Sequence, residues 1–171
     1  MKILTQNEVK IVSVCGARDI TSEIFERAEK LGNLLAKEGY VVACGGLSGT
    51  MEAVAKGALS AGGTTVGILP TYSKESANPY ITIAIPTGLG ESRNIILVSM
   101  ADVVVSISGG AGTLSEIALA WKLGKPVVSL STSGGWSAKL AGTRIDSTRA
   151  ATIYSASTCE EVIDFVNSQL K

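Results

Sequence analysis

Short runs of β-branched and other apolar residues alternate along this chain with longer segments of helical pattern. Two of these runs, KIVSVCG (10–16) and DVVVSIS (102–108), are apolar nearly throughout instead of alternating with polar residues. Strands of this kind are typical of parallel sheets that helices cover on both faces. The same features predict five further strands, within YVVACGG (40–46), TTVGILP (64–70), ITIAIPTG (81–88), PVVSLS (126–131) and ATIYSAS (151–157).

Helical patterns over roughly 22–38, 49–61 and 159–169 fall between or after these runs. Strand–helix alternation with right-handed crossovers predicts an α/β fold, a Rossmann-like, doubly wound, mainly parallel sheet of about seven strands with helices on both faces. A chain of 171 residues has the length of one domain, so we expect a single domain over 1–171. Residues 71–80 read as a surface loop, and 131–150 as either a lid over the ligand crevice or an exposed connection anchored by Trp136.

Composition narrows the function classes. Hydrophobic residues make up 46% of the chain and charged residues only 18%, which suits a two-sided sheet and a buried subunit contact, so we expect a homo-oligomer. The formal net charge is zero and there is no basic run, which argues against nucleic acid as a partner. The first residues are too polar for a signal peptide and no stretch reaches the roughly 20 apolar residues of a membrane helix, so we expect a cytoplasmic protein without membrane contact.

The residues available for chemistry are also restricted. The chain has no histidine, which excludes Ser-His-Asp and Cys-His mechanisms and zinc-protease helices. Cys15, Cys44 and Cys159 are widely spaced with no CxxC pair, so we expect small core residues and no metal site.

Two glycine-rich turns share one design. Each leaves a strand through Gly-Gly and enters a helix at Gly-Thr, in CGGLSGTMEA (44–53) and SGGAGTLSEI (108–117). Glycines allow a ligand to approach the backbone, and the free N–H groups of a helix start bind anions. A tight strand-to-helix turn would explain one such sequence, but two in one sheet favour phosphate or nucleotide binding. The candidate binding residues are Gly45, Gly46, Gly49, Thr50, Gly109, Gly110, Gly112 and Thr113.

Glu116 has two interpretations. With Thr113 it fits the Ser/Thr-x-x-Glu capping box, a pattern that recurs at TCEE (158–161). It also follows an anion-binding turn, where a carboxylate near a helix N-terminus is expected to stay ionised and can activate water or face developing positive charge.

Arg93 opens a strongly apolar helix and is the only arginine between Arg27 and Arg144. Arginine holds phosphate or carboxylate bidentately, whereas the dipole of a helix start does not favour a cation. An exposed arginine is the alternative, but the mismatch favours a functional role.

Taken together, CGGLSGTMEAVAKGA, ESRN and SGGAGTLSE resemble the LOG-like Rossmann proteins, over about residues 10–130. This superfamily includes the cytokinin riboside 5'-monophosphate phosphoribohydrolases, often mislabelled lysine decarboxylases, and the molybdenum cofactor carrier proteins. The resemblance implies that Arg93 and Glu116 are catalytic, that the second glycine turn holds the 5'-phosphate and that the first contributes the neighbouring wall. The reaction implied is hydrolysis of a nucleoside 5'-monophosphate to free base and ribose 5-phosphate, with no cofactor required.

Two residues depart from the hydrolase signature Pro-Gly-Gly-x-Gly-Thr-x-x-Glu and its upstream Arg-Lys pair. Ser108 stands at the proline position and Asn94 at the lysine position. The compact chain and TSGGW after the sixth strand are closer to the short, carrier-like branch. Two hypotheses follow: a phosphoribohydrolase, or a carrier of a phosphorylated cofactor, molybdopterin-like or nucleotide. Nothing in the sequence suggests the pyridoxal-phosphate lysine of a decarboxylase.

Overall fold

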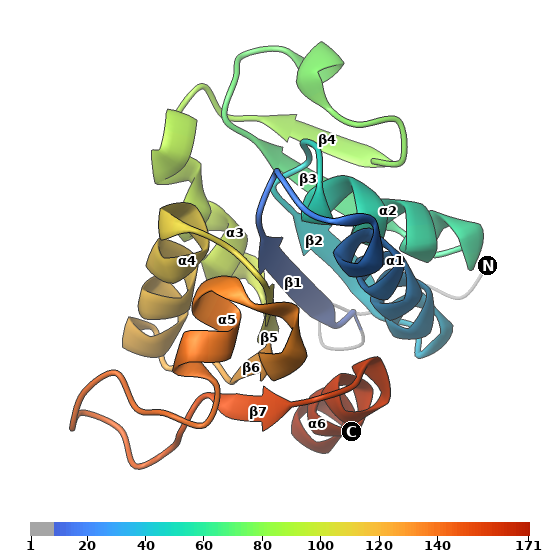
Figure 1. Cartoon of the computed structure of the whole chain (residues 1–171). Coiled ribbons are helices and arrows are strands. Elements are labelled where there is room, and N and C mark those ends of the chain that lie inside the picture. Colours follow the sequence, from blue (N-terminus) through green and yellow to red (C-terminus); the bar gives the residue numbers. More distant parts are fainter. Residues whose placement is uncertain (1–8) are drawn as a thin grey trace.

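A computed structural model describes residues 9–171. The strands are β1 (Ile11–Gly16), β2 (Val41–Cys44), β3 (Thr65–Leu69), β4 (Ile83–Pro86), β5 (Val103–Ile107), β6 (Val127–Leu130) and β7 (Tyr154–Ala156). They form one sheet in the order β4-β3-β2-β1-β5-β6-β7, and all the pairings are parallel (Figure 1). The seven-stranded Rossmann-like fold predicted from the apolar runs is confirmed.

Helices cover both faces of the sheet. They are α1 (Ser22–Lys37), α2 (Thr50–Ser60), α3 (Asn94–Met100), α4 (Ala111–Lys122), α5 (Gly135–Leu140) and α6 (Cys159–Leu170), with short 3-10 turns η1 (Lys74–Ser76), η2 (Gly90–Arg93) and η3 (Ser131–Ser133). The helices α1, α2 and α6 pack on one face, and α3, α4 and α5 on the other (Figure 1). Alternate residues of each central strand supply the two cores: Val12 and Val14 of β1 face α1 and α2, whereas Cys15 faces α3 and α4.

The strand order changes direction between β1 and β5. From β1 the chain continues outward to β4, then returns through η2 and α3 to place β5 beside β1, in register from Val12 with Val103 to Gly16 with Ile107. The loops that leave β1 and β5 therefore diverge toward opposite faces of the sheet. In open α/β sheets this switch point is where ligands bind, at the carboxyl ends of the strands.

The segment 131–150, which was a candidate lid, does not extend across this edge of the sheet. Residues 131–140 form η3 and α5, and Trp121 of α4 donates a 2.9 Å hydrogen bond from Nε1 to the Asp146 carboxylate. Arg149 stacks on the Trp121 ring and donates to the carbonyls of Trp121, Gly124 and Lys125, at the C-terminal end of α4. The segment therefore packs against α4 and stabilises its position. Trp121 is more deeply buried than Trp136, the residue that was expected to anchor the segment.

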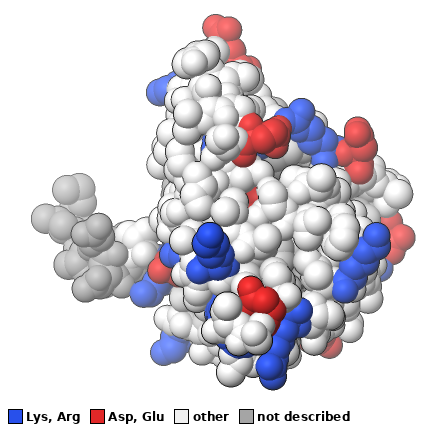
Figure 2. Space-filling view, turned by 90° about the vertical axis from the view of Figure 1, so that its left-hand side faces the viewer, with Lys and Arg blue, Asp and Glu red and all other residues white. Residues whose placement is uncertain are grey.

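Charges are mixed on the side of the molecule that carries α3 and α4. Figure 2 shows single Lys, Arg, Asp and Glu residues there, separated by wide uncharged areas. No broad patch of one sign is seen on this face, as a chain of zero net charge suggests. No helix among residues 9–171 combines the length and apolar character that crossing a membrane requires.

Candidate functional site

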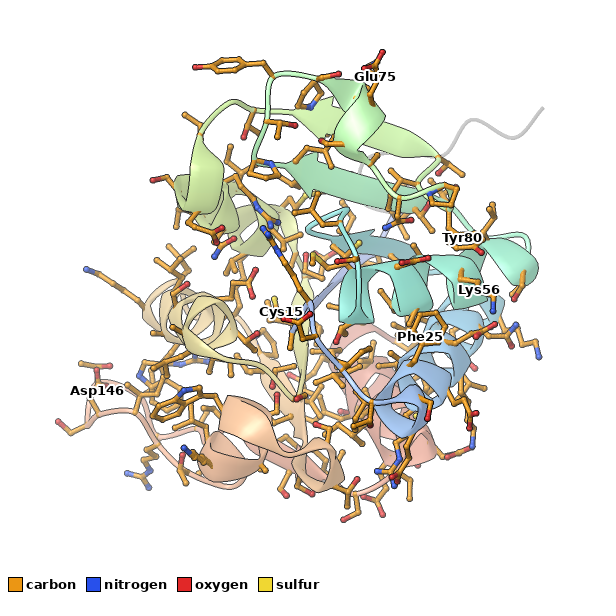
Figure 3. The ribbon with its side chains drawn as sticks, turned by 45° about the horizontal axis from the view of Figure 1, so that its top comes forward. Cys15, Phe25, Lys56, Glu75, Tyr80 and Asp146 are labelled. Carbon is orange, nitrogen blue, oxygen red and sulfur yellow. The ribbon has the colours of Figure 1, made fainter. Side chains whose placement is uncertain are left out.

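A cavity of about 370 Å³ opens at the switch point between β1 and β5. Its lining comes from five places in the fold: the end of β1 and the loop that follows, the loop after β2, the start of α2, the η2–α3 junction, and the first turns of α4. Six of the residues predicted from the sequence line it together: Gly45, Arg93, Gly110, Gly112, Thr113 and Glu116. Figure 3 looks down toward this edge of the sheet, with Cys15 near the centre between α2 and α4.

The second glycine turn is held from behind by the segment after β6. Ser108 adopts φ 54°, the left-handed conformation that non-glycine residues rarely take. Its N–H donates a 2.7 Å hydrogen bond to Ser133 Oγ, and its carbonyl accepts hydrogen bonds from both the N–H and the hydroxyl of Ser137. The next carbonyl, of Gly109, accepts from Trp136 N–H at 3.0 Å. These bonds fix an otherwise unfavourable backbone, as is common at functional sites.

Gly110 and Gly112 leave their backbone open to the cavity. A Cβ at either position would meet no heavy atom within 4 Å, and neither residue has a positive φ. Gly110 is the N-cap of α4 and has no side chain to satisfy the free N–H groups of the first turn. Packing therefore gives no reason for glycine at these two positions, whereas the approach of an anion does.

The glycines of the first turn are required by packing. A Cβ on Gly49, which has φ 69°, would lie 2.1 Å from the carbonyl oxygen of Arg18, and one on Gly46 would lie 2.6 Å from Leu69. Thr50 donates its N–H to Ala17 O at 3.0 Å, so this turn braces the loop that leaves β1. Gly45 is the only glycine of the turn that lines the cavity in the described structure; Gly46, Gly49, Thr50 and, in the second turn, Gly109 lie behind its wall. The two turns share a sequence pattern but differ in their exposure to a ligand.

Arg93 is buried at the end of η2. It is 4% exposed, and its Nε and Nη1 atoms have no hydrogen-bond partner within residues 9–171. A Cβ on Gly45 would lie 2.2 Å from Nη1, so glycine is needed there to make room for the guanidinium. The alternative of an exposed arginine is wrong. A buried cation with unsatisfied donors is unfavourable unless an anion completes it.

Glu116 is buried on the cavity side of α4, 7% exposed. Burial raises the pKa of its carboxyl to about 7, and this effect outweighs the opposing influence of the Arg93 guanidinium and the Cys15 thiol. The carboxyl group, which the sequence predicted to stay ionised near a helix start, is therefore only partly ionised in the free protein near pH 7, because desolvation favours the neutral acid. Both protonation states are populated at neutral pH.

The capping-box interpretation of Glu116 is also wrong. The N-cap of α4 is Gly110, three residues before Thr113, and Thr113 is itself buried within the helix. The same pattern in α6 does cap its helix: Thr158 Oγ1 accepts from Glu161 N–H at 3.2 Å, and Glu161 accepts from Ser157 N–H at 2.6 Å. Glu116 is thus free of a capping role.

Cys15 belongs to the cavity, which the sequence analysis missed. All three cysteines are buried and reduced as expected of core residues, but Cys15 also lines the cavity next to Glu116. Burial, reinforced by the charge of Glu116, raises the pKa of its thiol well above the ordinary value, so the thiol is neutral. Nothing in the apolar sequence of β1 indicates that its penultimate residue, Cys15, lies next to a carboxylate.

Two further polar features frame the opening. Arg18 and Glu91 lie across the mouth from each other as an exposed ion pair, with 3.7 Å between Nη2 and Oε1. Asn94 donates from Nδ2 to Ser115 Oγ at 3.3 Å, while its buried Oδ1 has no partner among the described residues. Within the same part of the chain, no group of three or more His, Cys, Asp or Glu side chains could hold a metal ion.

Comparison with known proteins identifies the family. The model of the SLOG cluster4 family matches residues 9–163. The chain belongs to this family. A curated relative of this SLOG cluster4 chain, the cytokinin riboside 5'-monophosphate phosphoribohydrolase of Mycobacterium tuberculosis, is 31% identical over 136 residues, covering 74% of this chain and 73% of the relative. The LOG-like resemblance inferred from the two glycine turns and ESRN is therefore confirmed.

Solved structures of cofactor carriers are similar over almost their whole length. The molybdenum cofactor binding protein of Rippkaea orientalis is 36% identical, with a TM-score of 0.83 over 95% of this chain and 98% of its own. The molybdenum cofactor carrier protein of Chlamydomonas reinhardtii is 34% identical, with a TM-score of 0.82 over 94% of this chain and 98% of its own. The SLOG cluster4 chain thus has hydrolases and carriers among its relatives, and these similarities support both hypotheses without deciding between them.

Proposed function

We propose that this protein binds a phosphorylated small molecule in the cavity, with the phosphate between the start of α4 and Arg93. One observation carries the proposal: a buried guanidinium whose Nε and Nη1 lack partners within residues 9–171 shares the cavity with open backbone at Gly110 and Gly112. Arginine and helix N-termini are the groups that hold phosphate in proteins, and here both line one cavity.

In this arrangement the predicted residues have two different roles, contact with the phosphate and support of the turns. Gly110, Gly112 and Thr113 contact the phosphate, and Gly45 gives Arg93 the room to reach it. Gly46, Gly49, Thr50 and Gly109 keep the two turns in shape behind the cavity wall. A volume of about 370 Å³ is within the usual range for small-molecule sites.

The carrier hypothesis receives support from the shape of the turn. Proline fixes φ near −65°, so the hydrolase-type proline cannot take the φ of 54° that Ser108 adopts, nor donate to Ser133. The phosphate turn of this chain therefore differs in backbone from one that contains the hydrolase proline. We propose a phosphorylated pterin or nucleotide as cargo, in a cytoplasmic homo-oligomer.

Glu116 supports a second candidate function, hydrolysis of the N-glycosidic bond of a nucleoside 5'-monophosphate. With a pKa of about 7, its ionised form can accept a proton from water at neutral pH. The water oxygen bonds to C1′ of the ribose, the bond from C1′ to the base nitrogen breaks, and its electron pair leaves with the base. The proton held by Glu116 then passes to that nitrogen, giving free base and ribose 5-phosphate.

Calorimetric titration with adenosine monophosphate tests the binding proposal. We expect binding by the wild type, and loss of binding in Gly110→Val, which fills the open space at the turn, and in Arg93→Ala. Arg144→Ala removes an exposed arginine outside the cavity and should bind like the wild type. Binding that survives both cavity variants would contradict the proposed position of the phosphate.

Chromatography of the same mixtures distinguishes carrier from hydrolase. Release of adenine by the wild type, lost in Glu116→Gln with binding retained, supports hydrolysis. Tight binding without any free base supports the carrier, as does a phosphorylated pterin found by native mass spectrometry of the purified protein. Absence of any bound nucleotide or co-purified phosphorylated molecule would refute both.

A further inference from the structure

A second hollow of about 400 Å³ adjoins the cavity, and Arg18 lines both. Its other walls come from the first glycine turn, the start of α2 and the loop between β3 and β4. They are formed by Leu47, Ser48, Glu52, Ser76, Asn78 and Pro79. The cavity and this hollow therefore lie side by side along the carboxyl edge of the sheet.

The walls of this second hollow are fixed. Asn78 donates its N–H to Gly46 O at 2.8 Å and its Nδ2 to Leu47 O at 2.8 Å, and its Oδ1 accepts from Tyr80 N–H at 3.1 Å. These bonds tie the β3–β4 loop to the first glycine turn and hold the Asn78 side chain in place. Its volume of about 400 Å³ is within the usual range for small-molecule sites.

The first cavity is suited to an anion, because Arg93, Asn94 and the start of α4 line it. The second hollow offers apolar surface from Leu47 and Pro79 together with the Arg18 guanidinium, which can stack on a ring face. A ligand with its phosphate in the first cavity can place its ring in the second.

Glu52 is the carboxylate of the second hollow. It is partly buried at the third position of α2, and within residues 9–171 its side chain makes no hydrogen bond of 3.5 Å or shorter and no ion pair. A carboxylate accepts two parallel hydrogen bonds but donates none. A ring that meets it must present two adjacent donors.

We propose that Glu52 selects a ring with a 2-amino-4-oxopyrimidine edge, the edge that guanine and pterins share. The ring N–H and the adjacent amino group of this edge donate to the two carboxylate oxygens. Hypoxanthine offers only the N–H, and adenine places the lone pair of a ring nitrogen against the carboxylate. This inference rests on the proposed phosphate site and adds the class of ring to it.

Titration of the full chain with guanosine, inosine and adenosine monophosphates tests the proposal. We expect affinity to fall in that order, with guanosine monophosphate bound about 10- to 100-fold more tightly than adenosine monophosphate, as for a bidentate contact that discriminates between bases. Glu52→Gln should reverse the preference, because an amide presents one acceptor and one donor, which match the amino group and ring nitrogen of adenine. Glu52→Asp keeps the charge but shortens the side chain, so it should weaken guanosine monophosphate without strengthening adenosine monophosphate.

Glu75→Gln is the matched control, since Glu75 is exposed in η1 outside both hollows, and it should keep the wild-type preference (Figure 3). Equal affinity of the wild type for guanosine and adenosine monophosphates would overturn the inference, as would an unchanged preference in Glu52→Gln. If Arg93→Ala still abolishes binding in that case, the phosphate site stands and only the role of Glu52 fails. If no nucleotide binds the wild type and no phosphorylated molecule co-purifies with it, both proposals fail.

Discussion

Replacing Gly112 by alanine is expected to change the stability of the protein and its affinity for a ligand in opposite directions. Gly112 lies in the first turn of α4, and a Cβ there would meet nothing within 4 Å. Alanine in a helix is more stable than glycine by about 0.5–1 kcal/mol. In a chain of this size that corresponds to a rise in Tm of about 1–4 °C. We therefore expect Gly112→Ala to be more stable than the wild type.

The same methyl group is expected to weaken ligand binding. It would stand where the phosphate approaches the backbone N–H groups, and loss of one charge-assisted hydrogen bond changes the binding free energy by about 1.5–3 kcal/mol. This corresponds to about a 10- to 150-fold weaker Kd for a nucleoside monophosphate.

Thermal unfolding followed by circular dichroism and calorimetric titration measure the two effects on the same samples. Ser168→Ala, an exposed change in α6 far from the cavity, controls for helix propensity and should leave affinity unchanged. A higher Tm with unchanged affinity would refute the argument that a ligand approaches α4 at this position. A lower Tm would refute the claim that the space beside Gly112 is open.

Three other experiments test the site and the assembly. Ser108→Pro should unfold the turn or the protein, because proline cannot take φ 54° and loses the bond to Ser133, whereas Ser108→Gly should be at least as stable as the wild type by thermal unfolding. The pKa of Glu116 is raised from 4.5 to about 7, so the folded state binds the extra proton between these values. Stability should fall by up to about 3 kcal/mol as pH rises from 4.5 to 7 and then level off, and Glu116→Gln should remove this dependence in urea titrations. Light scattering at micromolar concentration should show an oligomer, as the high apolar content predicts, and a monomer would contradict that expectation.

The strand pattern and the shared site could be predicted because they depend on short-range signals. Apolar runs identify buried parallel strands, and the carboxyl ends of such strands meet at one edge. The resemblance to the LOG-like proteins implied that Arg93 and Glu116 share a site with the glycine turns, and in the structure both line one cavity with Gly110 and Gly112.

The difference between the two glycine turns could not be predicted. Both read Gly-Gly followed by Gly-Thr, but Gly49 abuts the carbonyl of Arg18, whereas Gly112 faces open space. That difference depends on neighbours from other parts of the chain. The left-handed Ser108 is a further case, since its support comes from Ser133 and Ser137 after the next strand.

The raised pKa of Glu116 could not be predicted for a related reason. The position of a carboxylate near a helix start is visible in the sequence, but the depth of its burial beside Cys15 is not. Desolvation at that depth outweighs the helix dipole. Local rules therefore located this carboxyl group but did not predict its raised pKa.

The hydrogen bonds from α5 to the second glycine turn link the stability of two regions. Trp136 and Ser137 donate their N–H groups to the turn on the side away from the cavity, so opening of α5 would release the backbone that holds a phosphate. A ligand that binds only the closed turn must then suppress local unfolding of α5, by mass action. Amide hydrogen exchange at Trp136 and Ser137 should slow in proportion to ligand concentration, so occupancy of the cavity could be read from two amides that do not touch the ligand.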